Sequence, residues 1–209
     1  MTVLRKTQPD YTLEEYAELE KSSEERLEFF EGNVWSMAGA SPGHEDIVSN
    51  LITELKTKLR GRGCKVFGSN LRVKVPIYQP YRYPDVTGIC ETPIYEDFYG
   101  LEVLTNPALI VEVLSPSTEA FDLNEKFSYY KSIESFTEYL LIAQDAPLVT
   151  LYTKQGEGAW LHRQFDSLDA TVYLSSLDCE ISLAEIYLDI EFDASARPRF
   201  PLNPFDFPA

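Results

Sequence analysis

Apolar and polar residues follow two different periods along this chain, which predicts both helices and strands and so a mixed α/β (α+β) fold. Three segments have apolar residues at helical spacing or carry the residues that start a helix. They cover residues 12–21, 41–61 and 122–131. Ser41 is the expected N-cap of the second helix, with Pro42 in its first turn, and Asp122 is the expected N-cap of the third.

The predicted strands alternate apolar with polar residues or form short continuous apolar runs. They lie at residues 26–30, 34–37, 64–68, 71–76, 83–90, 108–114, 137–143, 148–153, 159–165 and 171–174. A helical turn is expected at 183–188, and residues 76–83 should form a loop. The acidic and aromatic stretch 91–106 is expected to be a loop long enough for a lid or a subunit contact. These elements predict one central mixed β-sheet flanked by helices.

Length and composition predict one domain over residues 11–193, because 209 residues with 44% hydrophobic content can bury a single core. Residues 1–10 are a polar leader without the apolar centre of a signal peptide. Residues 194–209 form a tail rich in Pro and Phe that cannot be a regular element. No run approaches the roughly 18 apolar residues of a membrane span, so we expect no membrane association.

The three cysteines, Cys64, Cys90 and Cys179, are far apart in the sequence and form no C-x-x-C pair. This spacing argues against a disulfide framework and against a zinc cluster. Reduced cysteines are typical of the cytoplasm. The sequence therefore predicts a cytoplasmic protein.

The net charge of −16 disfavours nucleic-acid binding when it is taken over the whole chain, because phosphates are repelled by an acidic surface. Residues 55–84 are an exception, since they contain no Asp or Glu and hold 8 of the 18 basic residues. A polyanion could dock on this segment, with phosphate contacts from Lys56, Arg72, Lys74 and Arg82. The alternative is a solvated basic helix face in an acidic protein.

Glu112 is the one charged residue in the apolar run 108–114, which is typical of a strand buried on both faces. Burying a carboxylate costs several kcal/mol unless a basic partner, a raised pKa or a metal ion compensates. No Lys or Arg lies within ten residues on either side, so the compensation must come from elsewhere. The alternative is an ordinary strand whose Glu faces solvent.

Asp85 begins the strand before this run and lies 27 residues ahead of Glu112. If the two strands are neighbours, their carboxylates converge, and the backbone carbonyl of Val113 would add a third oxygen. Oxygen ligands without a nearby cysteine suit Mg²⁺ or Mn²⁺ better than zinc. Lys126, on the following helix, would orient a water molecule and offset charge on a phosphate. The alternatives are a hydrogen-bonded Asp at a strand start and a surface Lys.

A longer set of motifs connects these residues. It comprises 26–32, His44, 83–86, 110–118, Asp122, Lys126, Tyr130 and 138–139. Pro84-Asp85 and Glu112 resemble the PD-(D/E)XK nuclease signature, although Leu114 stands where its lysine usually lies. The whole set resembles the Uma-type family of restriction-endonuclease-like proteins over roughly residues 11–190, and 112–118 is its most specific part.

The resemblance implies a restriction-endonuclease-like core in which Asp85 and Glu112 bind Mg²⁺ (or Mn²⁺) and Lys126 is a lysine that has migrated to the next helix. Glu28 matches the early glutamate of the family and would complete the site. His44 would be an accessory residue near it, or have a structural role as a helix cap. The acidic remainder of the chain and the aromatic stretch 94–104 suggest a homodimer, since many endonuclease-like domains resemble homodimers that cut two strands, and DNA is the expected partner.

The favoured function is a metal-dependent endonuclease that hydrolyses phosphodiester bonds in DNA. A non-catalytic nucleic-acid-binding or scaffold protein with the same fold is the alternative, favoured by the net charge and by Leu114. Retention of the candidate site residues argues against that alternative. A glycoside hydrolase with Glu112 and Asp85 as its acid and base would explain neither Lys126 nor the basic segment.

Overall fold

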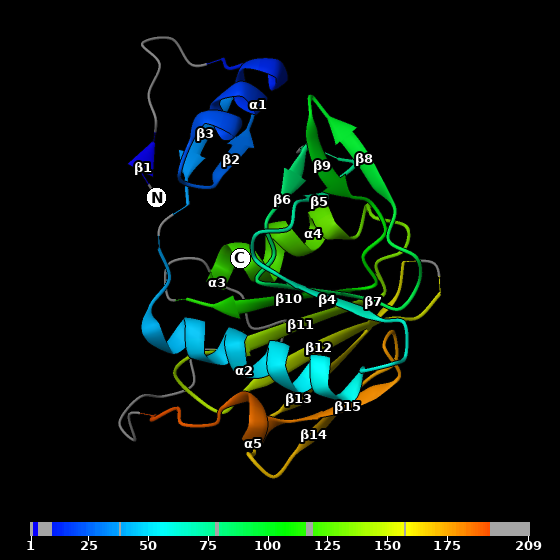
Figure 1. The fold of residues 1–209 in the computed structure, drawn as a ribbon. Helices are drawn as coiled ribbons and strands as arrows, with labels where there is room; N and C mark the ends of the chain where they lie inside the picture. The colour runs from blue at the N-terminus through cyan, green and yellow to red at the C-terminus, as the bar shows by residue number, and fades with distance from the viewer. Residues whose placement is uncertain are drawn as a thin grey trace.

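The computed structural model describes residues 2–3, 10–37, 39–77, 80–115, 119–156 and 158–192. Within these residues, a six-stranded sheet in the order β13-β12-β11-β10-β7-β4 forms the centre of the molecule (Figure 1). Its strands are β4 (Lys65–Gly68), β7 (Val86–Ile89), β10 (Leu109–Leu114), β11 (Glu138–Ala143), β12 (Val149–Lys154) and β13 (Trp160–Phe165). β10 and β11 are parallel, and the other neighbouring pairs are antiparallel. The predicted mixed sheet is confirmed.

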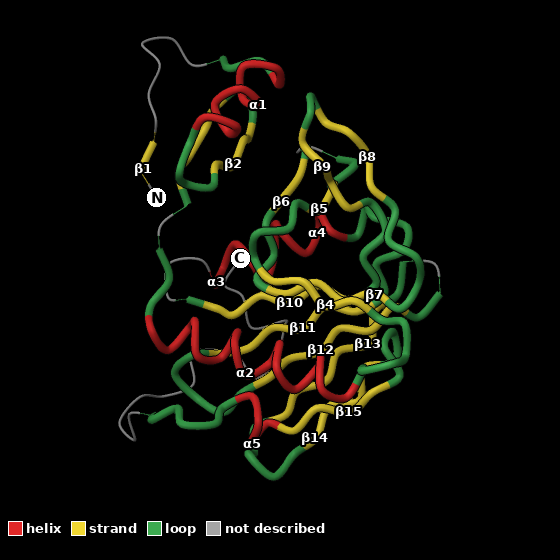
Figure 2. The backbone as a smooth tube through the Cα atoms, in the orientation of Figure 1, coloured by secondary structure: helices red, strands yellow, loops and turns green. Residues whose placement is uncertain are grey.

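Helices cover both faces of the sheet, as Figures 1 and 2 show. On one face lies α2 (Pro42–Lys58), whose buried Leu51 belongs to the same apolar cluster as Val111 of β10. On the other face lie α3 (Glu119–Phe121), the π-helical turn η1 (Asp122–Lys126) and α4 (Phe127–Tyr130). Because successive strand residues point to opposite faces, Glu112 points to the face that η1 and α4 cover.

Three smaller groups of elements surround the central sheet. The N-terminal group is β1 (Thr2–Val3), α1 (Leu13–Ser22), β2 (Leu27–Phe30) and β3 (Asn33–Ser36). A second sheet, in the order β6-β5-β9-β8, consists of β5 (Val73–Lys74), β6 (Tyr81–Arg82), β8 (Tyr95–Phe98) and β9 (Leu101–Leu104). The last group is β14 (Thr171–Leu174), β15 (Cys179–Ser182) and α5 (Leu183–Ile186).

The expectation of a long loop at 91–106 is wrong, because this stretch contains the β8–β9 hairpin. Its turn residues, Tyr99 and Gly100, have φ of 50° and 83°. Two central residues with positive φ are typical of a type I′ turn, which usually contains Asn-Gly, so the tyrosine concealed the turn. β6 lies within the predicted loop 76–83, and β15 was not predicted.

The predicted helix 122–131 is longer and less regular than expected. It begins with α3 at Glu119 and contains a π-helical turn. Asp122 is therefore inside the helical segment, where its carboxylate pairs with Lys126, and the prediction that it is an N-cap is wrong. The predicted loop residues 116–118 lie outside the described residues, as do most of the leader and the tail. No helix in the described ranges is long and apolar enough to cross a membrane.

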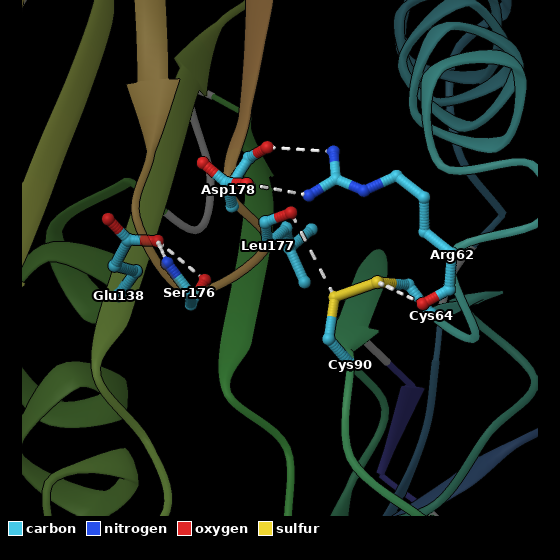
Figure 3. Close-up of a disulfide and its surroundings, with 7 residues drawn as sticks. All are labelled: Arg62, Cys64, Cys90, Glu138, Ser176, Leu177 and Asp178. Carbon is cyan, nitrogen blue, oxygen red and sulfur yellow. Dashed lines mark hydrogen bonds and ion pairs between the residues drawn. A yellow bond between two sulfur atoms is a disulfide. The ribbon is translucent and has the colours of Figure 1, made fainter.

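The argument against disulfides is wrong for Cys64 and Cys90, which are bonded to each other (Figure 3). The antiparallel register pairs Lys65 of β4 with Ile89 of β7, so the two cysteines face each other one step further along. Their separation of 26 residues concealed this pairing. Cys179 is buried and free. The cysteine spacing therefore no longer supports a reducing compartment.

We expect reduction of the Cys64–Cys90 bond to lower the free energy of unfolding by about 3 kcal/mol, because it releases a 26-residue loop in the unfolded chain. Urea denaturation with and without dithiothreitol measures the difference. Cys64→Ser/Cys90→Ser is the control and should not respond to the reductant. Alkylation of the denatured, unreduced protein should label Cys179 alone. Labelling of all three cysteines would contradict the bond.

Candidate functional site

Glu112 lies on β10 and Asp85 directly precedes the neighbouring strand β7, as a shared site requires. β7 and β10 are antiparallel with Val86 opposite Val111, so the residues next to this pair meet at one end of the strands. Oδ2 of Asp85 accepts a hydrogen bond of 2.7 Å from the backbone N–H of Val113. The structure therefore brings Asp85 directly to the backbone that follows Glu112.

Pro84 removes one possible hydrogen-bond donor to the Val113 carbonyl. In an antiparallel pair, a residue that turns its N–H toward the neighbouring strand turns its C=O there too. Continuing the register of β7 and β10 puts Pro84 opposite Val113. Proline has no amide hydrogen, so it cannot donate to the Val113 carbonyl. At this end of the β7–β10 ladder, the Val113 N–H is therefore bound by the Asp85 carboxylate, and the Val113 carbonyl receives no hydrogen bond from Pro84.

Glu112 is buried and has two side-chain partners on the helical layer above it. The hydroxyl of Tyr130 donates to its Oε1 at 2.8 Å, and Nζ of Lys126 donates to its Oε2 at 3.0 Å. Nζ of Lys126 also lies 2.7 Å from Oδ1 of Asp122. Of the compensations considered for Glu112, the described residues thus supply a basic partner, 14 positions further along the chain.

Burial and charge act in opposite directions on this cluster. Burial raises the pKa of the Glu112 carboxyl, while the charge of Lys126 opposes the rise. Burial alone would lower the pKa of Lys126, but the carboxylates of Glu112 and Asp122 outweigh it and raise this pKa above its usual value. Lys126 therefore keeps its positive charge inside the protein. It is presented by a π-helical turn, a distortion that is frequent at functional sites.

His44 lies at the same site, in the first turn of α2. Its Nε2 is 3.1 Å from Oδ1 of Asp85. Burial alone would lower the pKa of His44, but the hydrogen bond and charge of Asp85 raise it above the ordinary histidine value. The carboxylate of Asp85 is thus held from two sides, by the His44 ring and by the Val113 amide.

Gln144 was missed by the sequence analysis. It directly follows β11, and its side chain lies 3.4 Å from Nδ1 of His44 and donates to the Leu114 carbonyl at 2.8 Å. Its position at the end of β11 is consistent with a site residue, because β11 is parallel to β10 and side chains at the carboxyl ends of parallel strands gather at one edge of the sheet. Only the strand directions, which the sequence did not give, reveal that edge.

Glu28, from β2, lines the same cavity but is ion-paired to the buried guanidinium of Arg82. Arg82 is packed between aromatic rings, with its guanidinium carbon 5.3 Å from the ring centre of Phe121 and 5.7 Å from that of Tyr129. The negative charge of Glu28 also acts on Lys126. Glu28 is therefore part of the charged cluster, with a protein cation as its direct partner.

These side chains surround one cavity of about 290 Å³. The residues that line it include Glu28, His44, Asp85, Glu112, Lys126 and Gln144. The cavity brings together side chains from two strands of the central sheet, the N-terminal group and helices on both faces. The candidate residues Asp85, Glu112, Val113, Lys126, Glu28 and His44 all lie at this one place.

The sequence matches the Uma2 family, described as "Putative restriction endonuclease", over residues 13–186. The chain belongs to this family. It is 33% identical over 184 residues to the uncharacterized protein slr1290 of Synechocystis sp. (strain ATCC 27184 / PCC 6803 / Kazusa), covering 88% of this chain and 95% of that protein. It is 37% identical over 164 residues to the uncharacterized protein sll1609 of the same strain, covering 78% and 92%.

A crystal structure of "a putative nuclease belonging to DUF820" from Anabaena variabilis ATCC 29413 resembles this Uma2-family chain with a TM-score of 0.66. The two sequences are 22% identical, and the match covers 85% of this chain and 97% of that one. At this identity the likeness shows the fold. The predicted α/β (α+β) class with a restriction-endonuclease-like core is confirmed.

The oxygen atoms of this Uma2-family site fit a hard divalent cation. The carboxylates of Asp85 and Glu112 and the carbonyl of Val113 are the ligands that Mg²⁺ and Mn²⁺ prefer. Within the described ranges, no three His, Cys, Asp or Glu side chains are grouped to enclose a metal ion.

The predicted phosphate contacts do not form one exposed basic surface. Three of the four cations are paired with carboxylates: Arg72 with Glu20, Lys74 with Glu96, and Arg82 with Glu28. Lys56 is exposed on α2. The sequence showed the absence of acidic residues between positions 55 and 84, but the fold supplies carboxylates to this segment from other parts of the chain.

Proposed function

We propose that this protein is a metal-dependent endonuclease that hydrolyses phosphodiester bonds in DNA. The observation that carries the proposal is the meeting of Asp85, Glu112 and the charged Lys126 in one cavity. Membership of a family described as "Putative restriction endonuclease" supports the nuclease chemistry. The description of the Anabaena variabilis protein as a nuclease agrees with it.

Asp85, Glu112 and the Val113 carbonyl would hold Mg²⁺ or Mn²⁺. When bound, such an ion lowers the pKa of a coordinated water and offsets negative charge on a phosphate. The protein's own contribution is to hold these ligands in place. Asp85 receives a hydrogen bond on each oxygen, and Glu112 is fixed by Tyr130.

Lys126 would offset the charge that develops on the phosphate oxygens during hydrolysis. Its ammonium already lies between two buried carboxylates, so it is oriented before a substrate arrives. Preorganised charge of this kind is commonly the largest electrostatic term in catalysis. We include Glu28 in the site because it lines the cavity and its negative charge acts on Lys126.

Substrate phosphates would contact Lys56 directly, while Arg72, Lys74 and Arg82 would have to share their carboxylate partners. The second candidate function is a non-catalytic nucleic-acid-binding or scaffold protein, which Leu114 at the usual position of the nuclease lysine favours. DNA binding that depends on salt but not on Mg²⁺, without cleavage, would identify that function. We also propose that the protein forms a homodimer, and sedimentation equilibrium of the purified protein tests the dimer.

Calorimetric titration with Mn²⁺ tests the metal site. We expect the wild type to bind the ion and Asp85→Asn to lose at least about tenfold in affinity, because even outer-shell partners of metal ligands contribute 10–100-fold. Asp169→Asn, which neutralises an exposed carboxylate outside the cavity, is the control and should bind like the wild type. Equal binding by all three proteins would exclude Asp85 as a ligand.

A further inference from the structure

The Gln144 side chain connects three groups that are distant in the sequence. Its Nε2 donates to the Leu114 carbonyl at 2.8 Å and lies 3.4 Å from Nδ1 of His44. Its Oε1 accepts a hydrogen bond of 2.9 Å from Oγ of Ser41. Ser41 is the N-cap of α2, so one amide joins β10, β11 and the helix that carries His44.

The Leu114 carbonyl determines which way this amide faces. A carbonyl oxygen only accepts hydrogen bonds, so the Gln144 atom beside it must be the NH₂ group. The second hydrogen of the same NH₂ group is then available to Nδ1 of His44. A ring nitrogen that accepts a hydrogen bond carries no hydrogen itself. In the neutral ring, the hydrogen must therefore be on Nε2.

We propose that Gln144 is a positioning residue that orients the His44 ring and selects the tautomer with its hydrogen on Nε2. That N–H then points at Oδ1 of Asp85, 3.1 Å away. With the Val113 N–H on Oδ2, each oxygen of the carboxylate receives one hydrogen bond and keeps a lone pair for another partner. The other tautomer would place a nitrogen lone pair against the carboxylate.

The orientation of Asp85 is important because Asp85 is a metal ligand in the proposed function, on which this inference rests. A carboxylate held in one plane presents its free lone pairs in a fixed direction, which favours a ligand that needs defined geometry. Outer-shell hydrogen bonds of this kind typically contribute 10–100-fold to metal affinity. A purely structural Gln144 would contribute to folding but not to the protonation of Nδ1.

Nitrogen-15 NMR of the imidazole rings tests the tautomer without metal or DNA. The chain has two histidines, and His162 on β13 serves as the internal reference. At about pH 9, where an ordinary histidine is neutral, we expect His44 to carry hydrogen on Nε2 only. Gln144→Glu replaces the donor beside Nδ1 with an acceptor, so Nδ1 should gain a hydrogen while the His162 signals stay unchanged.

Gln144→Leu removes the donor without placing a carboxylate beside the Leu114 carbonyl, and so serves as the second variant. We expect its Mn²⁺ affinity to fall by about tenfold, while Gln155→Leu, an exposed control, binds like the wild type. A hydrogen on Nδ1 in the wild type, or an unchanged His44 in Gln144→Glu, would overturn the proposal. If the tautomer is as expected but neither the wild type nor any variant binds Mn²⁺, the proposed function fails and the positioning role of Gln144 stands.

Discussion

Glu112→Gln should abolish metal-dependent DNA cleavage, with a loss of at least about 10²-fold, the size typical of removing one electrostatic group from a transition state. The substitution keeps the size of the side chain and an oxygen that accepts from Tyr130. Lys126 keeps its pairing with Asp122, so the helical layer should remain in place. The lost negative charge is the one that the proposed metal needs. Nicking of supercoiled plasmid in Mg²⁺ or Mn²⁺ measures the effect.

The matched control for this experiment is Glu180→Gln, an exposed position on β15. It makes the same chemical change outside the cavity and should cleave like the wild type. Thermal melting of both variants shows whether folding is preserved. Wild-type cleavage by a folded Glu112→Gln protein would be inconsistent with a catalytic role for Glu112. Absence of cleavage in the wild type would instead favour the non-catalytic nucleic-acid-binding function.

The sequence predicted those helices and strands whose positions depend on residues close together in the chain. The helix that begins after Ser41, the hairpin of β2 and β3, and the buried strand around Glu112 all match the expected positions. The β8–β9 hairpin was missed because Tyr99 occupies a turn position that usually holds Asn, Asp or Gly. Cys64 and Cys90 were missed because only the register of β4 and β7 brings them together.

The candidate site likewise combines residues that local patterns identify with residues that only long-range packing brings together. A carboxylate inside an apolar run marked Glu112, and Pro84-Asp85 marked the end of a neighbouring strand. The partners of these residues come from long-range packing, which leaves no local signature. Arg82 lies in a segment without acidic residues, yet its carboxylate partner is Glu28, 54 positions away. A basic stretch in a sequence therefore does not show where its charges are neutralised.

Glu138 shows how a motif can mark structure rather than chemistry. This fully buried carboxylate, which closes the family pattern, accepts hydrogen bonds from the backbone and side chains of Ser175 and Ser176 (Figure 3 shows Ser176). These bonds tie the turn between β14 and β15 to the start of β11. The sequence treated Glu138 as part of the same pattern as Glu112, but the described fold places it outside the cavity.

Lys126→Met should lower the free energy of unfolding by about 3–5 kcal/mol, the usual cost of removing one partner from a buried ion pair. The ammonium is buried between Glu112 and Asp122, at 3.0 and 2.7 Å. Methionine fills similar space but leaves two buried carboxylates facing each other without a cation. Urea denaturation measures the loss. Lys131→Met, directly after the same helical segment, removes an exposed ammonium stacked on Phe127 and should cost less than about 1 kcal/mol.

A variant that also carries Glu112→Gln and Asp122→Asn separates charge from packing. With no ionised carboxylates left beside the methionine, it should recover at least half of the stability lost in Lys126→Met. A loss no larger than that of Lys131→Met, or no recovery in the triple variant, would show that Lys126 is not the cation that neutralises the cluster.

The recovered triple variant should still fail to cleave DNA. Since this variant would be folded yet lack the charges of Glu112, Asp122 and Lys126, its failure to cleave DNA would show that cleavage needs these charges and not only the folded structure.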